Sequence, residues 1–399
     1  MPPVEEVKRR QRKDLHEYQG YDYLDAGGQG MVSVYMETDE HGKILSRVAA
    51  KDIYLDERHW KHMEWIDGLP ADIGGMYRLQ NQTTSVKPLR IEGHDVFAEL
   101  RMYEMRLEFA PHADLWDTLK RCRATKVRVP EPFLWYVQKS MVETGVLMGE
   151  GDLVTSKTPW RILVHKDIKL DNVVLAPPLD NEFPSYPTPK VMDFGHVGEI
   201  YAGNPRPMVD QCWGGTHGWR APERDPAYNP RGPMTQASDV YSVGLTIYHL
   251  MNLSLGGPPR LAQDGNPVFG DSDPGRLFSP TLQEVVRCMV QTDYASRPTF
   301  NYLHQFIAAL FATPADQVDA MRIKALATHR LEDAERWIPD SELWRFELDY
   351  RQDMKYRLDT VCRFLEPEEE PEDVTEGVAG QFGKLKVAGK GKVKKAASV

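Results

Sequence analysis

Several common signals are absent from this sequence. Its four cysteines, Cys122, Cys212, Cys288 and Cys362, are far apart and form no Cys-x-x-Cys pair. This spacing is typical of reduced thiols in a cytoplasmic or nuclear protein. No apolar run approaches the length of a membrane span, and the residues after Met1 lack the apolar segment of a signal peptide. We therefore expect neither secretion nor membrane insertion.

Positive charge is also in deficit. The chain has 59 Asp and Glu against 49 Lys and Arg, a formal net charge of −10 and an isoelectric point of about 5.7. Nucleic-acid-binding proteins usually present a basic face, so this composition argues against a specific nucleic acid partner. The 399 residues, of which 41% are hydrophobic, can build a sizeable core in two or three domains or in one large two-lobed unit.

Composition changes near both ends of the chain. Residues 1–17 contain a basic cluster and read as a solvated segment. Residues 313–365 combine helical patterning with aromatic residues, which predicts a helical extension that packs on the main body or binds a partner. Residues 366–399 carry an acidic run followed by a lysine-rich run with few apolar residues, so we expect a disordered tail.

One stretch, residues 162–175, places polar side chains in fixed spacing between two apolar runs. Asp167 is a carboxylate that can orient a hydroxyl and accept its proton. Lys169 can neutralise charge on a phosphoryl group. Asn172, together with Asp193 after the next apolar pair, offers the oxygen ligands that Mg²⁺ prefers. The pattern indicates phosphate chemistry.

A glycine cluster lies between two expected strands within residues 20–54. Gly27 and Gly30 belong to this cluster, and Lys51 lies on the strand that follows. A flexible backbone of this kind can lie over phosphates while a lysine holds their oxygens. Further strands are expected over 86–110, and helices over 57–82 (broken at Gly68–Pro70 and at Gly74–Gly75), 113–120, 131–148, 237–252 and 279–311.

Taken in order, residues 18–312 resemble the eukaryotic protein kinase domain, in a divergent form similar to fungal kinase-like proteins. The motifs that carry this resemblance are Asp25–Val32, Val48–Lys51, Leu107–Ala110, His165–Asn172, Asp193–Gly195, Gly215–Glu223, Asp239–Gly244 and Arg297–Pro298. The resemblance implies an α+β, two-lobed fold. A small β-rich N-lobe would span 18–110 and a larger helical C-lobe 111–312, with the helical extension after it.

The resemblance also implies a part for each site residue. Asp167 would take the proton of the substrate hydroxyl, and Lys169 with Thr216 is similar to the serine/threonine type. Asn172 and Asp193 would bind Mg²⁺. The ATP site would comprise Gly27, Gly30, Val32, Ala49 and Lys51 in the upper strands, the hinge residues Glu108 and Ala110, Asp171 beside the metal ligand, and Glu64 as the helix carboxylate that pairs with Lys51.

Two departures from the kinase pattern bear on regulation. Lys166 stands where most kinases have an arginine that grips a phosphorylated activation loop, and a lysine has no planar fork. Cys212 stands four residues before Thr216, where a regulatory phosphothreonine often lies. We hypothesise that phosphorylation at this site does not switch the protein.

Substrate preference and competing functions complete the sequence-based expectations. Asp114 and Asp171 fall where kinases that favour basic substrates often carry acids, whereas a third such position is His249. This predicts a protein substrate with Arg or Lys upstream of the target Ser or Thr. The leading function is an ATP- and Mg²⁺-dependent protein serine/threonine kinase. The alternatives are a pseudokinase that acts as a scaffold, favoured by Asp25 in place of the first loop glycine, and a small-molecule kinase.

Overall fold

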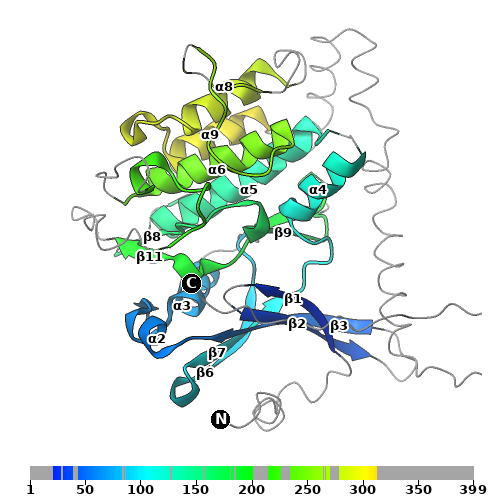
Figure 1. Cartoon of the computed structure of the whole chain (residues 1–399), viewed down its shortest axis with the longest axis vertical. Coiled ribbons are helices and arrows are strands. Elements are labelled where there is room, and N and C mark those ends of the chain that lie inside the picture. Colours follow the sequence, from blue (N-terminus) through cyan, green and yellow to red (C-terminus); the bar gives the residue numbers. More distant parts are fainter. Residues whose placement is uncertain are drawn as a thin grey trace, which may run out of the picture.

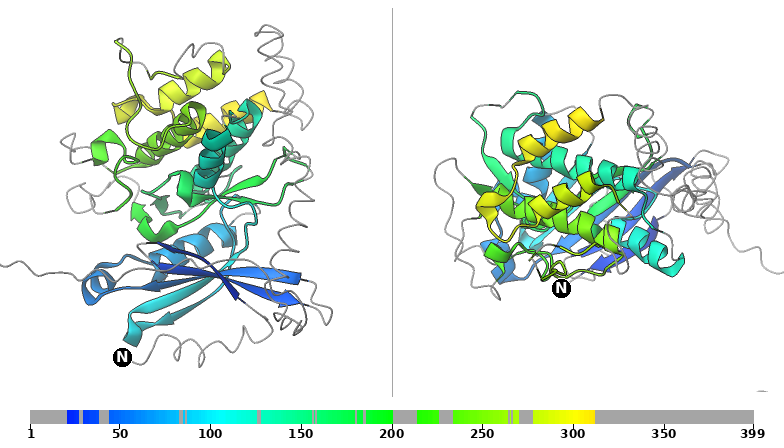
Figure 2. Two further views of the ribbon diagram at one scale, coloured as in Figure 1. Left: turned by 45° about the vertical axis from the view of Figure 1, so that its right-hand side comes forward. Right: turned by 90° about the horizontal axis from the view of Figure 1, so that it is seen from above.

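In the computed structural model, a β-sheet and a group of helices form two lobes (Figures 1 and 2). The structure describes residues 21–27, 30–38, 44–82, 85, 87–125, 128–155, 157, 159–179, 181–183, 186–200, 214–225, 234–263, 265, 267–269 and 278–311. The expected α+β, two-lobed architecture is confirmed.

The N-terminal lobe is built on a five-stranded antiparallel sheet. Its strands, in the order β1-β2-β3-β7-β6, are β1 (Tyr21–Gly27), β2 (Gly30–Thr38), β3 (Ile44–Tyr54), β7 (Met102–Glu108) and β6 (Ile91–Phe97). Lys51 of β3 is opposite Val32 on one side and Met105 on the other. Because side chains alternate along a strand, Val32, Ala49 and Lys51 share one face of the sheet.

Two helices and a hairpin separate β3 from β6. They are α2 (Glu57–His62), the short strands β4 (Trp65–Ile66) and β5 (Leu69–Pro70), and α3 (Ala71–Gln82). The expectation of a helical stretch over 57–82 was right in part, since Gly68–Pro70 falls in the hairpin. Gly74 and Gly75 were expected to break a helix, but they lie inside α3.

The C-terminal lobe is helical around one long buried helix. Its helices are α4 (Leu115–Thr125), α5 (Glu131–Glu150), α6 (Gln236–Asn252), α8 (Pro280–Met289) and α9 (Phe300–Leu310). Sixteen residues of α5 are buried, including polar Gln138 and Ser140. A helix that is covered on all sides marks the centre of a lobe, and α6 and α9 pack directly on α5.

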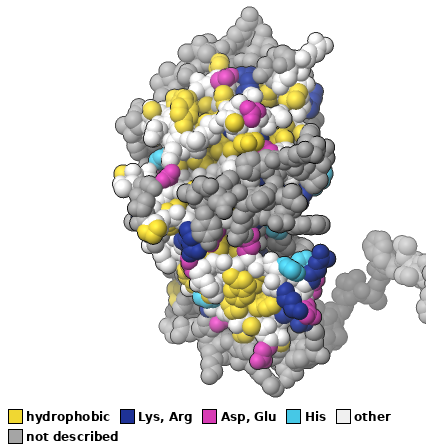
Figure 3. Space-filling view, turned by 90° about the vertical axis from the view of Figure 1, so that its left-hand side faces the viewer, with side chains coloured by type: hydrophobic (Ala, Val, Ile, Leu, Met, Phe, Trp, Pro, Cys, Tyr) yellow, Lys and Arg dark blue, Asp and Glu magenta, His cyan; other side chains and the backbone are white. Residues whose placement is uncertain are grey.

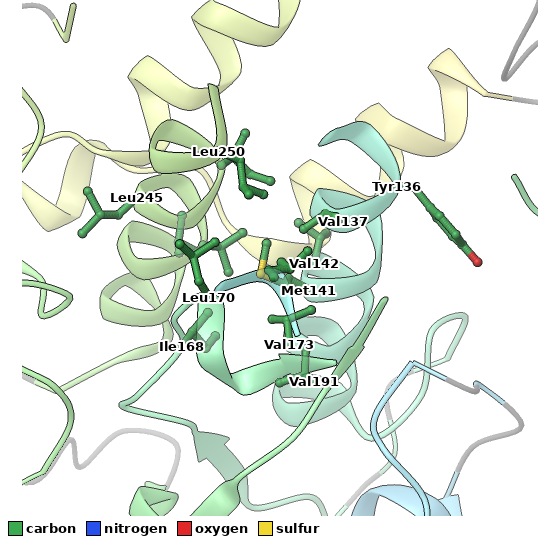
Figure 4. Close-up of a cluster of buried hydrophobic side chains, with 14 of the residues drawn as sticks. Tyr136, Val137, Met141, Val142, Ile168, Leu170, Val173, Val191, Leu245 and Leu250 are labelled. Carbon is green, nitrogen blue, oxygen red and sulfur yellow. The ribbon is translucent and has the colours of Figure 1, made fainter. Parts of the chain in front are cut away.

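Short strands of the C-terminal lobe carry the polar motifs. They are β8 (Ile162–Val164), β9 (Val173–Ala176), β10 (Thr188–Val191) and β11 (Gly198–Ile200), paired as β8 with β11 and β9 with β10. The two apolar runs around Asp167 are β8 and β9, as expected. Between them, Ile168 and Leu170 point into the core among residues of α5 and α6 (Figure 4). These two buried side chains fix the Asp167 loop to the helical core.

The proline-rich insertion, residues 177–187 between β9 and β10, contributes side chains to the core. Phe183 is fully buried, stacks on Tyr136 of α5 with ring centroids 4.6 Å apart, and contacts Phe311 edge-on. Tyr186 stacks on Phe133 of the same helix at 5.4 Å. Glu182 forms ion pairs with two lysines, Lys87 and Lys139. The insertion therefore packs on α5 and forms part of the helical lobe.

On the face shown in Figure 3, basic and acidic side chains lie next to one another between hydrophobic areas. Within the described ranges, no helix combines the length and apolar character needed to cross a bilayer. The predicted segments 1–17, 313–365 and 366–399 lie outside the described residues, and the domain boundaries stay predictions.

Candidate active site

Asp167 lies at the centre of the loop between β8 and β9, and its carboxylate is held on two sides. Its Oδ1 accepts a hydrogen bond of 2.6 Å from the backbone N–H of Thr216, and its Oδ2 accepts one of 3.2 Å from Asn172 Nδ2. Lys169 Nζ lies 3.8 Å from Oδ2. Three of the predicted residues, Lys169, Asn172 and Thr216, thus converge on the carboxylate that was expected to take a proton.

The backbone of this loop rests on a buried carboxylate from α6. Asp239 is completely buried, and its two oxygens accept hydrogen bonds from the N–H groups of His165 (2.7 Å) and Lys166 (2.9 Å). The ring of His165 lies 4.8 Å from that of Phe194, and its Nε2 contacts the carbonyl oxygen of Met192 at 3.1 Å. These contacts connect the Asp167 loop to the segment that carries Asp193.

Lys51 brings the upper lobe to this site. Its ammonium lies 2.6 Å from Asp193 Oδ1 and 3.4 Å from Asp72 Oδ2, and both pairs are largely shielded from solvent. The helix carboxylate that pairs with Lys51 is therefore Asp72 of α3, and the prediction of Glu64 was wrong. Glu64 precedes the β4–β5 hairpin, whereas Asp72 follows it and begins the helix that faces β3.

The helix that carries Asp72 packs closely on its neighbours at two glycines. A Cβ at Gly74 would come within 2.2 Å of the carbonyl oxygen of Ile66, and one at Gly75 within 3.2 Å of Val197 Cγ1. Glycine inside a helix costs about 1 kcal/mol relative to alanine. This cost accompanies close packing of α3 on Ile66 and Val197.

The side chains of Lys51, Asp193 and Asp72 shift one another's pKa values. Burial would lower the pKa of Lys51, but the carboxylates of Asp72 and Asp193 raise it. Burial would raise the pKa of Asp193, yet the ammonium of Lys51 lowers it to about 2. Burial raises the pKa of Asp72 above the ordinary carboxyl value, against the pull of Lys51. At neutral pH a charged Lys51 and an ionised Asp193 follow.

Asn172 and Asp193, the two predicted metal ligands, suit a hard divalent cation. Asn172 Nδ2 donates to the carbonyl oxygen of Asp167 at 2.8 Å as well as to its carboxylate, so the amide oxygen is the atom left for a cation. Asp193 adds an ionised carboxylate. Protein Mg²⁺ sites often supply only one or two such oxygens and leave the others to phosphate and water. The donor set therefore fits Mg²⁺ bound with a nucleotide.

The residues predicted to hold ATP lie on the same side of the upper lobe. Gly27 and Gly30 pair across the β1–β2 turn, and a Cβ at Gly30 would lie 2.4 Å from the carbonyl oxygen of Asp52. Ala49 pairs with Leu107 of β7. Leu107 is followed by Glu108 and then by Phe109–Ala110, which lead to the lower lobe. The Glu108 side chain pairs with Lys190 at 2.5 Å. Its backbone N–H donates to the carbonyl oxygen of Arg90 at 3.0 Å, so this N–H is not available to an adenine.

Lys166 is engaged within the protein. Its side chain is buried and its Nζ lies 3.9 Å from Glu64 Oε1. Gly198 of β11 makes room for this pair, since a Cβ there would lie 2.9 Å from Lys166 Nζ. Glu64 thus has a partner in the described structure, but the partner belongs to the lower lobe.

A second group of charges joins α3 to β11. Arg78 Nε donates to Asp67 Oδ2 at 2.8 Å, and Arg78 also forms an ion pair with Glu199 of β11. Arg161 binds the same two carboxylates, with Nη1 3.1 Å from Glu199 and Nη2 2.9 Å from Asp67. We call these four residues the charge ring. The charge ring holds the helix that carries Asp72 against the strand that follows Asp193.

The predicted acidic positions differ in their surroundings. Asp114 caps the start of α4 by accepting from the N–H of Asp117 at 2.8 Å, and burial raises its pKa to about 6. Asp171 is 43% exposed and lies 3.5 Å from Lys169. His249 is buried, contacts Ser254 and the carbonyl oxygen of Gly257, and burial lowers its pKa to about 4. His249 is therefore neutral at pH 7.

Residues 214–225 are fixed to the helical lobe by a buried ion pair. Arg297 donates two hydrogen bonds of 2.7 Å to the two oxygens of Glu223, and both side chains are buried. The pair joins two of the motifs that carry the resemblance, Gly215–Glu223 and Arg297–Pro298. The hydroxyl of Thr216 has no described hydrogen bond, whereas its N–H is the group that holds Asp167. Thr216 thus contributes its backbone.

Two residues at this site were not found from the sequence. Asp72 gave one usable signal, an acid in the first turn of a helix directly after a proline, but the expectation of a glutamate obscured it. Arg224, which is buried under the Asp167 loop, gave none, because arginine is mostly exposed in proteins.

Comparison with known families matches residues 28–307, more than half of the chain, to the protein kinase domain. Similar proteins include "Serine/threonine-protein kinase LMTK1" of mouse, 26% identical over 56% of this chain and 16% of its own length. The fly "Membrane-associated tyrosine- and threonine-specific cdc2-inhibitory kinase" is 29% identical over 51% of this chain and 32% of its length. "PTI1-like tyrosine-protein kinase 2" of Arabidopsis thaliana is 26% identical over 59% and 66%. This chain spans less than two thirds of each relative.

Proposed function

The chain belongs to the protein kinase family, and on this premise we propose that it transfers the γ-phosphate of ATP to Ser or Thr hydroxyls of a protein. The observation that carries the proposal is the convergence of Lys169, Asn172 and the N–H of Thr216 on one carboxylate, Asp167. Lys51, paired with Asp193 and Asp72, lies on the opposite lobe.

Each group has a defined task in this proposal. Asp167 orients the acceptor hydroxyl and accepts its proton, and Lys169 offsets charge on the phosphoryl group. Lys51 holds ATP phosphates, while the backbone of Glu108–Ala110 meets the adenine. Mg²⁺ would be held by Asn172 and Asp193 and would neutralise charge between the phosphates. Rate acceleration in such a site comes mainly from positioning and charge neutralisation.

The choice of Ser and Thr over Tyr rests on Lys169 beside Asp167. The names of the relatives include serine/threonine and tyrosine kinases, so the acceptor must be measured. The purified full chain is incubated with labelled ATP, Mg²⁺ and peptide libraries that contain Ser, Thr or Tyr as the sole acceptor. Transfer to Ser or Thr peptides, lost in Asp167→Asn, supports the proposal; transfer to Tyr alone refutes it.

We propose a preference for Arg or Lys upstream of the acceptor, since Asp114 and Asp171 add negative charge near the Asp167 loop. The neutral His249 adds none, so the preference should be moderate. A positional peptide array on the active chain tests this. Acidic or proline-directed peptides as the best substrates would contradict it.

A pseudokinase is the second candidate, and two observations favour it. Lys51 lies 3.4 Å from Asp72, longer than a strong ion-pair hydrogen bond, and Asp25 replaces the first glycine of the loop. If the chain binds ATP in a fluorescence titration but transfers no phosphate to itself or to any library, this second candidate replaces the first. Transfer to a small molecule without any protein acceptor indicates a small-molecule kinase.

A cytoplasmic or nuclear location is also proposed, because four widely spaced cysteines suit a reducing compartment. Imaging of the tagged full chain checks this. A signal confined to a secretory compartment would contradict it.

A further inference from the structure

Arg224, the residue after Glu223, is fully buried, and none of the catalytic tasks proposed above uses its side chain. Its guanidinium lies below the Asp167 loop. Nη1 donates a hydrogen bond of 2.9 Å to the carbonyl oxygen of Lys166, and Nη2 donates one of 3.2 Å to the carbonyl oxygen of Gly214. One side chain therefore joins two chain segments that meet at Asp167.

The first of these segments is strained. Lys166 has φ 71°, in the left-handed region that non-glycine residues avoid. Such a conformation costs about 1–3 kcal/mol and persists only where its surroundings hold it. Here the N–H of Lys166 donates to Asp239, and its carbonyl oxygen accepts from Arg224. A carboxylate and a guanidinium thus hold the residue whose peptide bond leads directly into Asp167.

The second segment touches Asp167 itself. Gly214 accepts from Arg224, and a Cβ at Gly215 would lie 2.3 Å from the carbonyl oxygen of Lys166, so the two segments are in close contact. The next N–H, that of Thr216, donates to Asp167 Oδ1 at 2.6 Å. The position of this donor depends on how Gly214–Gly215 is held against Lys166.

Charge balance explains why an arginine can be buried here. An unpaired buried cation would be strongly unfavourable. Asp239 and Glu223 lie close enough to act on its charge, although burial still lowers the pKa of Arg224. A lysine could supply the charge but not two donors with fixed separation, because only guanidinium has the planar fork.

We infer that Arg224 is a positioning residue for catalysis, which aligns Asp167 by holding the carbonyl groups of Lys166 and Gly214 together. This inference rests on the proposed kinase function. Both acceptors are backbone carbonyls, so the link needs no phosphorylated side chain. It also deepens the hypothesis drawn from Lys166 and Cys212, because the alignment is complete within the unmodified protein.

The test compares Arg224→Gln, Arg224→Lys and Arg224→Ala with the wild-type full chain. Loss of two hydrogen bonds from a charged donor should lower kcat about 10–100-fold in Arg224→Gln and Arg224→Lys. The KM for ATP should stay within about twofold, because the two described hydrogen-bond partners of Arg224, Lys166 and Gly214, are not among the residues predicted to hold ATP. Added guanidinium ion should restore part of kcat in Arg224→Ala and leave Arg224→Lys unchanged. Arg123→Gln, which removes an arginine that donates to the carbonyl oxygen of Leu253 far from Asp167, is the control.

Hydrogen exchange gives a second readout that needs no activity. In Arg224→Gln the amides of residues 214–219 should exchange at least about tenfold faster, while those of α5 keep their protection. Unchanged exchange there, or wild-type kcat in a folded Arg224→Gln, overturns the inference. A wild-type chain without transferase activity would contradict the proposed function alone, since exchange still decides the positioning.

Phosphatase treatment completes the test. Treated wild-type protein should retain its full kcat. Tyr201 is the one hydroxyl residue between Gly195 and Gly215 in the sequence. If phosphate removal abolishes activity and Tyr201→Phe reproduces the loss, the alignment depends on a phosphate and the inference is wrong.

Discussion

Replacing Asp72 with asparagine tests the least expected feature of the site. Lys51 Nζ lies 3.4 Å from the carboxylate of Asp72, which is 1% exposed. Water therefore cannot solvate Lys51 in place of the lost carboxylate. Hydrogen bonds to a charged group contribute about 1.5–3 kcal/mol. Every 1.4 kcal/mol corresponds to about tenfold in rate, so kcat/KM for ATP should fall about 10–100-fold.

The loss should concern nucleotide use more than folding. In Asp72→Asn, Lys51 keeps only Asp193 as a charged partner, at 2.6 Å. Because ATP phosphate would bind Lys51 and Mg²⁺ would bind Asp193, this remaining ion pair competes with both. The assay measures initial rates over a range of ATP at fixed peptide, with thermal unfolding in parallel. Asp72→Glu keeps the charge and should lose less activity than Asp72→Asn.

A matched control is available on the surface of the same lobe. Asp95 pairs with Arg106 at 2.7 Å and is 43% exposed, so Asp95→Asn should leave kcat/KM unchanged. The reasoning is refuted if folded Asp72→Asn stays within about threefold of wild type while Lys51→Met is inactive. In that case Lys51 would act without a carboxylate from α3.

Three other predictions follow from features away from Lys51. Arg78→Met breaks the charge ring. It should lower the free energy of unfolding in urea by about 3 kcal/mol, because Asp67 and Glu199 then keep only Arg161 as a partner. A change below about 0.5 kcal/mol would show that Arg78 is not needed to hold α3 against β11. Phe183→Ala removes a fully buried ring and should cost about 3–5 kcal/mol in the same experiment, whereas a small loss would mean that the proline-rich insertion is not part of the core. The carboxyl of Asp114, with a pKa of about 6, is neutral below that pH and negative above it. The KM for a peptide with an upstream Arg should therefore fall as pH rises from about 5 to 7, and Asp114→Asn should lose this dependence; an equal trend in that variant would assign it to another group.

The lower half of the site could be predicted from the sequence because its residues are close along the chain. Asp167, Lys169 and Asn172 lie within six positions, and local spacing of that kind fixes which side chains meet. The carboxylate that pairs with Lys51 could not. Asp72 follows the β4–β5 hairpin, which lies between Glu64 and α3 and was not predicted from the sequence.

Burial was the other quantity that the sequence did not reveal. Phe183 and Tyr186 lie in a stretch rich in prolines that reads as an exposed turn, yet both reach α5. Arg224 reads as a surface residue next to a conspicuous motif. In each case the contact joins segments far apart in the chain, so its presence depends on the assembled lobe.

The paired glycines of α3 have a consequence for the gene that encodes this protein. Every missense change of a glycine codon adds at least a Cβ atom, and at Gly74 that atom would meet the carbonyl oxygen of Ile66 at 2.2 Å. No single-nucleotide substitution offers a smaller residue. The Gly74 codon should therefore tolerate almost no missense variation. A saturation-mutagenesis library selected for activity should be depleted there more than at Gly75, where the nearest atom, Val197 Cγ1 at 3.2 Å, belongs to a side chain.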